Sequence, residues 1–243
     1  MVRAKPDGQT LLIASVGIAA NPSLYPKLGL DPGKQLAPIS LLANAPTVLV
    51  VPPALPVGSL PGFIAYAKAH PGALNFGSYG AGSGPHLATE LFMAMTGTRL
   101  VHIAYGGGGP AALAAMSNQV QVLFASVLPV LGMVRDGSLK ALAIAADRRS
   151  PLLPGVPTFK ESGVDYRTGT WFGLLAPAMT PPDVIATLNR ATVAVLRDAR
   201  ARERLEAQGA EVVAGSPEEF GAFIRTETDR LSRVIRAANI RLD

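Results

Sequence analysis

The chain contains no cysteine, which excludes disulfide bonds, thiol catalysis and cysteine-ligated metals. Histidine is also scarce, and His70, His86 and His102 have none of the HxxxH or HExxH spacings that hold zinc. Charged residues make up 16% of the chain and hydrophobic residues 49%, which is typical of a globular protein and not of a disordered one. We therefore expect no metal and no other cofactor.

Long apolar runs are missing as well. The longest, around Val120 to Val134, is interrupted by Pro129 and is too short to cross a bilayer. The N-terminal MVRAKPDGQT has no apolar segment after its charges, so we expect the chain as written to lack a signal peptide, to be soluble and not to insert into a membrane. The net charge of +5 includes a cluster of mixed sign at residues 197–206, which is typical of a solvated helix face. No aromatic residues alternate with it, so we expect no nucleic-acid binding.

The order of apolar runs and turn residues predicts an α/β protein. Short apolar runs predict strands at residues 10–15, 46–53, 100–105, 120–126, 139–146 and 171–177, the first of them buried. Helical segments separate most of these runs, which indicates parallel strands joined by right-handed crossovers. Ser59 is a predicted N-cap, and Ser216 with Glu219 predicts a capping box at the last helix.

The stretch NFGSYGAGSGPHLATELF, residues 75–92, reads as a strand end, a loop and a helix. Its glycines have the spacing GxGxG instead of the dinucleotide fingerprint GxGxxG, and no Lys-Ser or Lys-Thr follows them as in a phosphate-binding loop. No GxSxG motif surrounds Ser78 or Ser83, which argues against a nucleophile elbow. Glu90 and Asp136 are interpreted as surface charges, so no carboxylate pair for acid–base catalysis is predicted. His86, in the first turn of the helix, is a candidate hydrogen-bond donor, and His102 is interpreted as a core histidine.

Capture of a carboxylate remains as the chemistry that this loop favours. Its hydroxyls, its exposed backbone N–H groups and the positive end of the following helix dipole all attract an anion without a lysine. The predicted ligand-binding residues of the loop are Ser78, Gly80, Ala81, Gly82, Ser83 and Gly84. A second glycine turn at residues 105–110 and a third strand ending at Ser126 are expected at the same edge of the sheet. A plain strand-to-helix turn of small residues stays open as the alternative.

Several segments in order resemble one known family. They are DGQTLLIAS, NPSLYPKL, LAPISLLANAPTVLVVPP, LNFGSYGAGSGPHLATELF, VHIAY, KALAIAADRRSPLLPGVPTFKESG and TWFGLLAPAMTPPDVIATLN. Together they resemble the Bug (TctC-like) receptors, the extracytoplasmic substrate-binding proteins of tripartite tricarboxylate transporters. The resemblance implies a type II periplasmic-binding-protein fold, in which two crossing strands join two α/β lobes. One lobe would comprise residues 1–51 and 171–243, and the other residues 52–170.

The resemblance also implies a binding function without catalytic residues. The ligand would be a small organic carboxylate, the partners would be the membrane components of a tripartite transporter, and the protein would be a periplasmic monomer. Carried over by position, Ser15 contributes from the first lobe, the loop Ser78–Gly84 from the second, and Ser126 and Thr170 lie near the cleft.

Three departures from the family pattern qualify these expectations. The family has a strand, a glycine-rich loop and a helix before the Asp-Gly motif near which this chain starts, so we expect an N-terminally truncated first lobe. Ala125-Ser126 stands where the family often has Asp-Asn, which argues against cation-bearing ligands, and four glycines follow Tyr105 where it often has Lys-Gly-Ser. Two alternatives stay open: an α/β hydrolase-like or acyl-transfer enzyme with a base beside Ser78 or Ser83, and a degenerate paralogue or fragment that does not bind.

Overall fold

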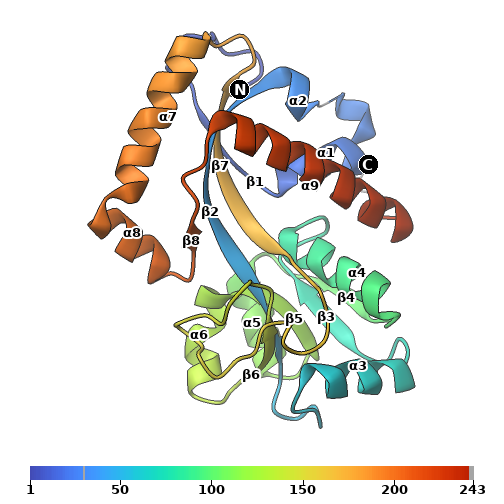
Figure 1. The fold of residues 1–243 in the computed structure, drawn as a ribbon. Helices are drawn as coiled ribbons and strands as arrows, with labels where there is room; N and C mark the ends of the chain where they lie inside the picture. The colour runs from blue at the N-terminus through green and yellow to red at the C-terminus, as the bar shows by residue number, and fades with distance from the viewer. Residues whose placement is uncertain (30, 241–243) are drawn as a thin grey trace. The chain divides into compact units, whose positions relative to one another are not determined.

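The computed structural model describes residues 1–29 and 31–240. The chain divides into two compact units, the first formed by Met1–Asn44 with Thr170–Asp243 and the second by Ala45–Gly169. Two long strands carry the chain from one unit into the other and back (Figure 1). The boundaries predicted after residues 51 and 170 stay a prediction.

The first unit contains a small sheet with antiparallel pairs and several helices. Its strands are β1 (Leu12–Ser15), the first part of β2 (Leu36–Val51), β7 (Gly169–Pro177) and β8 (Glu211–Val212). Its helices are α1 (Gly17–Leu24), the 3-10 turn η1 (Pro26–Leu28), α2 (Pro32–Gln35), α7 (Pro182–Arg197), α8 (Ala199–Glu206) and α9 (Pro217–Ala237). Figure 1 shows α1 lying beside α9, and the two helices pack against each other.

The second unit alternates strands and helices. Its strands are the second part of β2, then β3 (Asn75–Ser78), β4 (Val101–Ala104), β5 (Val122–Ser126) and β6 (Lys140–Ile144). Its helices are α3 (Leu60–Ala69), α4 (Gly84–Thr96), α5 (Gly108–Met116) and α6 (Val127–Arg135). Buried aromatic rings fill one face of this sheet, and the Tyr166 hydroxyl there donates to the Ala88 carbonyl at 2.6 Å.

Pairing within the sheets is parallel only in part. Strand β3 pairs in parallel with β4 and β5, as the sequence predicts. The prediction is wrong for β2, which pairs antiparallel with both β5 and β6, and for β1, which pairs antiparallel with β7. The reason is that β2 and β7 connect the two units and do not belong to the strand–helix–strand repeats.

Two strand predictions need further correction. Strand β2 begins at Leu36, ten residues before the predicted start, and runs through Pro38 and Pro46. Proline fits extended backbone because its φ near −65° is allowed there, and only an N–H donor is lost. Strand β1 is not buried: it pairs on one side only, and Ile13 is 67% exposed.

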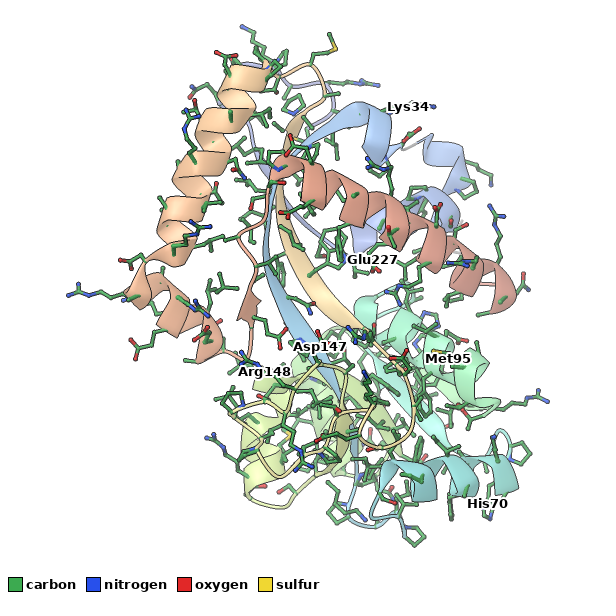
Figure 2. All side chains as sticks on the ribbon, viewed as in Figure 1. Lys34, His70, Met95, Asp147, Arg148 and Glu227 are labelled. Atoms are coloured by element: carbon green, nitrogen blue, oxygen red, sulfur yellow. The ribbon has the colours of Figure 1, made fainter. Side chains whose placement is uncertain are left out.

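The predicted helix starts and the predicted charged face are confirmed. The Ser59 side chain accepts a hydrogen bond from the Gly62 amide, and Ser216 and Glu219 form a reciprocal capping box at the start of α9. Helix α8 has no buried residue. The side chains of both units are drawn in Figure 2, where Glu227 of α9 is labelled; it forms a 2.8 Å ion pair with Arg230.

Candidate functional site

Three strand-to-helix turns of the second unit meet at one edge of its sheet. Because β3, β4 and β5 are parallel, their carboxyl ends share that edge, and Ser78 pairs directly with Ala104. The loop Ser78–Gly84 leads from β3 into α4, the glycine turn 106–109 leads from β4 into α5, and Ser126 joins β5 to α6. The structure thus brings together all the predicted site residues of this unit.

The three helices that start at this edge have, in the described part of the chain, no side-chain cap on their first backbone N–H groups. Their N-cap residues are Ser83, Gly107 and Ser126, and among the described residues none makes a side-chain capping hydrogen bond. No acidic residue lies in any of the three first turns. Free N–H groups at a helix N-terminus, reinforced by the dipole, favour an anion. This edge therefore suits a carboxylate.

The loop Ser78–Gly84 is held in shape by its own hydrogen bonds. The Gly80 amide donates to Ser78 Oγ at 3.2 Å, the Gly82 amide donates to His86 Nδ1 at 2.9 Å, and the Ser83 amide donates to the Gly80 carbonyl at 3.2 Å. Gly80 and Gly82 have φ of 118° and 73°, values that favour glycine. These glycines shape the loop, and their N–H groups are already used.

Other donor groups of the loop make no hydrogen bond within the described residues. In the part of the chain that the structure describes, the amides of Ala81 and Gly84 have no hydrogen-bond partner. The buried hydroxyls of Ser83 and Tyr79 also lack one within that part. An unpaired buried hydroxyl costs free energy, so each of these groups is available to donate a hydrogen bond to a bound acceptor.

Tyr79 is a candidate site residue that the sequence analysis missed. Its ring packs on the glycine turn, where a Cβ added at Gly108 would lie 3.3 Å from Tyr79 Cζ. Its hydroxyl faces the hydroxyl and amide of Ser126 without ordinary hydrogen-bond geometry. Burial raises the pKa of the phenol, and the nearby Ser126 groups oppose that rise. Tyr79 is therefore a neutral donor at physiological pH. Its place directly after a strand and before Gly80 was the available signal.

Three further residues behind the loop have surroundings that differ from those expected in the sequence analysis. His102 is not a simple core histidine, because its Nε2 lies 2.6 Å from Ser78 Oγ. His86 accepts a hydrogen bond through Nδ1, where a donor was expected. Glu90 is no surface charge: its side chain is 17% exposed and its Oε1 lies 3.5 Å from His86 Nε2. The spacing of four residues between His86 and Glu90 on one helix was the signal for this pair.

The enzyme alternative predicted a base beside a loop serine, and His102 lies beside Ser78. However, Ser78 is 0% exposed, and its Oγ also lies 3.0 Å from the Gly80 carbonyl oxygen. A nucleophile must reach its substrate, and this hydroxyl is enclosed by the loop that it supports. Ser83 Oγ, the other candidate, has no hydrogen-bonded base among the described residues.

Ser15 and Thr170 belong to the first unit. Ser15 is the last residue of β1 and pairs with Phe172, and Thr170 is the second residue of β7. Both side chains are half-buried. Their contact with a ligand stays a prediction.

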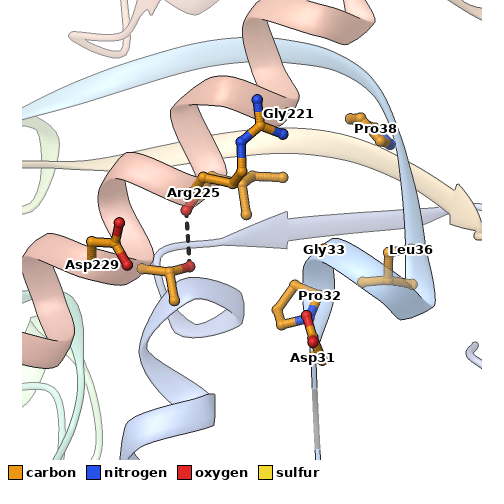
Figure 3. A pocket seen from close by; sticks show the side chains of 10 residues that line it. Asp31, Pro32, Gly33, Leu36, Pro38, Gly221, Arg225 and Asp229 are labelled. Atoms are coloured by element: carbon orange, nitrogen blue, oxygen red, sulfur yellow. Dashed lines mark hydrogen bonds between the residues drawn. The ribbon is translucent and has the colours of Figure 1, made fainter.

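The first unit also has surface hollows along α9. One, of about 260 Å³, lies between α2 and α9 and is lined by Pro32, Pro38, Arg225 and Asp229 (Figure 3). Its neighbour, of about 480 Å³, shares Pro38, Gly221 and Arg225. Their charges are exposed and of both signs, and neither hollow contains one of the unpaired buried hydroxyls. They are poorer candidates for a carboxylate than the strand ends.

Neither a metal site nor a membrane span is found in the described residues. Within 1–29 and 31–240, no cluster of three or more acidic or histidine residues could hold a metal ion. No helix there is both long enough and apolar enough to cross a bilayer.

Comparison with known proteins identifies the family. The family model described as "Tripartite tricarboxylate transporter family receptor" matches residues 1–240. Protein BugT of Bordetella pertussis is 36% identical over 243 residues, which cover 99% of this chain and 74% of BugT.

Solved structures agree in fold. Rpa4515 of R. palustris with adipate is 32% identical, with a TM-score of 0.86 over 99% of this chain and 82% of that one. MatC of Rhodopseudomonas palustris with bound malate is 31% identical, with a TM-score of 0.82 over 96% of this chain and 81% of that one. These matches confirm the predicted periplasmic-binding-protein fold and the receptor function, and they do not favour the enzyme alternative. The chain belongs to the receptor family of the tripartite tricarboxylate transporters.

Proposed function

We propose that this receptor binds a small organic carboxylate at the carboxyl ends of β3, β4 and β5. The observation that carries the proposal is the pair of buried, unpaired hydroxyls on Ser83 and Tyr79 beside three uncapped helix N-termini. Related receptors solved with adipate and malate support the same ligand class. In this proposal the hydroxyls and the amides of Ala81 and Gly84 contact the carboxylate, while Ser78, Gly80 and Gly82 shape the loop.

The loop carries no charge, which determines the kind of interaction that can hold an anion there. No lysine or arginine lies in the residues 78–84 or 105–110, so these two turns would hold the anion by hydrogen bonds and helix dipoles. Hydrogen bonds from neutral groups to a charged acceptor contribute about 1.5–3 kcal/mol each when water is excluded. Ser126 adds a further hydroxyl next to Tyr79, and Ser15 and Thr170 are proposed additional contacts from the first unit.

Calorimetric titration with adipate and with malate tests the proposal. Ser83→Ala and Tyr79→Phe each remove one hydroxyl and are expected to weaken binding roughly 10- to 150-fold, the equivalent of about 1.5–3 kcal/mol. Ser117→Ala is the matched control, because the Ser117 hydroxyl bonds the Ala114 carbonyl at the far end of α5. Ser15→Ala and Thr170→Ala show whether the first unit contributes. Binding that is unchanged in both hydroxyl variants would contradict the proposed site, and no binding of any di- or tricarboxylate would contradict the function.

We further propose that the protein acts outside the cytoplasm, as a monomer, and delivers its ligand to the membrane components of a tripartite transporter. Family membership supports this proposal. Light scattering with and without ligand tests the oligomeric state, and ligand-dependent crosslinking to the co-expressed membrane components tests the partnership. A ligand-independent dimer, or crosslinking that ignores ligand, would contradict it.

A further inference from the structure

Two histidine rings stack directly behind the candidate loop. The rings of His86, in the first turn of α4, and His102, in β4, are 3.9 Å apart and within 7° of parallel. Phe76 of β3 stacks on both, at 6.0 and 4.8 Å. The proposed carboxylate contacts do not use this imidazole pair, so its close packing calls for another role.

Each ring of the imidazole pair holds one part of the loop. His102 lies against Ser78 Oγ, which in turn accepts the Gly80 amide. His86 Nδ1 accepts the Gly82 amide. An imidazole nitrogen that accepts a hydrogen bond must carry a lone pair, so neutral His86 has its proton on Nε2, the nitrogen that faces Glu90. The conformation of both left-handed glycines therefore depends on these two rings.

We propose that His86 and His102 are positioning residues for ligand binding, and that the loop Ser78–Gly84 keeps its binding conformation only while His86 is neutral. This inference rests on the proposed function, since it assigns the control of that same site. A proton on Nδ1 would place two N–H donors against each other across a 2.9 Å contact, and either the ring or the Gly82 peptide would then have to move.

The charges around the imidazole pair indicate which ring takes a proton. Strands β3 and β5, which pack on α4, contribute no ionisable side chain, and Tyr166 bonds the α4 backbone. The charged neighbour is Glu90 of α4 itself. Burial, and then the neighbouring His86, lower the pKa of His102 to about 4, while Glu90 opposes this. Two stacked rings at this distance disfavour a second positive charge, and His86 is the ring that lies beside the Glu90 carboxylate.

The affinity for a carboxylate should therefore fall when His86 is protonated. Because one proton is taken up, the loss is expected to approach tenfold per pH unit, beyond the effect of the ligand's own titration. The ligand's titration is common to all variants of the protein, so the ratio of two variants' affinities isolates the contribution of the ring.

Two substitutions of His86 separate the roles of acceptor and ring. His86→Asn keeps an acceptor near the position of Nδ1 but cannot be protonated, so we expect near-normal affinity for adipate and malate at pH 8 and no acid-induced loss relative to wild type. His86→Phe keeps the stacking but removes the acceptor, so we expect an affinity on the order of 10-fold below that of wild type at pH 8, with no pH dependence beyond that of the ligand itself. His70→Asn is the control: this third histidine is the C-cap residue of α3 (labelled in Figure 2), its Nδ1 is bonded to the Tyr66 carbonyl, and its replacement should change neither affinity nor pH profile.

Nuclear magnetic resonance tests the same coupling without ligand. Titration of ¹⁵N-labelled protein should shift the Gly82 amide together with the ring nitrogens of His86, and should leave it unshifted in His86→Asn. A wild-type protein that binds no di- or tricarboxylate while Gly82 still follows His86 would refute the proposed function and support the role of His86 in holding the loop. A Gly82 amide that ignores His86, or a His86→Phe variant with wild-type affinity, would overturn the inference.

Discussion

A β-carbon added at Gly173 would overlap a buried ring. Gly173 lies in β7, opposite Ala14 of β1, and its Cβ would come within 2.6 and 2.7 Å of two ε carbons of Phe220 and closer still to Cζ. Phe220 of α9 is 0% exposed and packs edge-on against Trp171 at 5.8 Å. The φ of Gly173 lies outside the left-handed region, so space alone explains the glycine.

The substitution Gly173→Ala should therefore destabilise the protein by overpacking. Inserting one carbon into a packed core costs about 1–3 kcal/mol, and we expect the upper end because Phe220 is fully buried and packed against Trp171. Urea unfolding followed by circular dichroism gives the free energy of unfolding. Gly132→Ala is the matched control: a Cβ at Gly132, inside α6, meets nothing within 4 Å, so this variant should gain about 0.5–1 kcal/mol.

A second substitution checks the assigned cause. Phe220→Leu removes part of the ring, so in that background Gly173→Ala should cost clearly less than in the wild type. Equal costs in both backgrounds, or a Gly173→Ala variant within about 0.5 kcal/mol of wild type, would refute the steric explanation.

Three other predictions concern stability. Lys140 Nζ donates to three carbonyls between residues 53 and 57, at 2.6–3.3 Å, so Lys140→Met should lower the free energy of unfolding by about 1–3 kcal/mol and increase amide exchange in that turn. Ser216→Ala removes the N-cap of α9 and should cost about 1 kcal/mol in the same urea assay. The pKa of Glu161 is lowered by the Thr158 amide and by Arg149, so its contribution is present above the unfolded-state pKa and is lost as the pH falls through the folded one. Glu161→Gln should therefore be less stable than wild type at pH 7, and the difference should vanish in acid.

Much of the second unit could be predicted from the sequence because its signals are local. Apolar runs separated by helical segments identified β3, β4, β5 and β6, and the positive-φ glycines marked the loop after β3. The first half of β2 was missed because Pro38 and Pro46 interrupt its apolar pattern. Its extended conformation depends on pairing with β8, whose residues lie about 170 positions further along the chain.

The candidate site, too, could be predicted only in part from the sequence. Small residues after parallel strands predicted where the site lies, because the sheet brings the strand ends to one edge. The hydrogen bonds inside the loop could not be predicted, since the partners of Ser78 and Gly82 are His102, in another strand, and His86, in the following helix. Sequence treated each serine and glycine as a ligand contact, whereas the structure uses several of them to hold the loop.

The fold explains only two of the four glycines in the turn 106–109. Gly107, with φ of 152°, needs glycine for its backbone, and Gly108 needs it because the Tyr79 ring lies against it. A Cβ at Gly106 or Gly109 would meet nothing within 4 Å, so the fold does not require these two glycines. Both glycines are exposed, so a side chain at either position would extend into solvent.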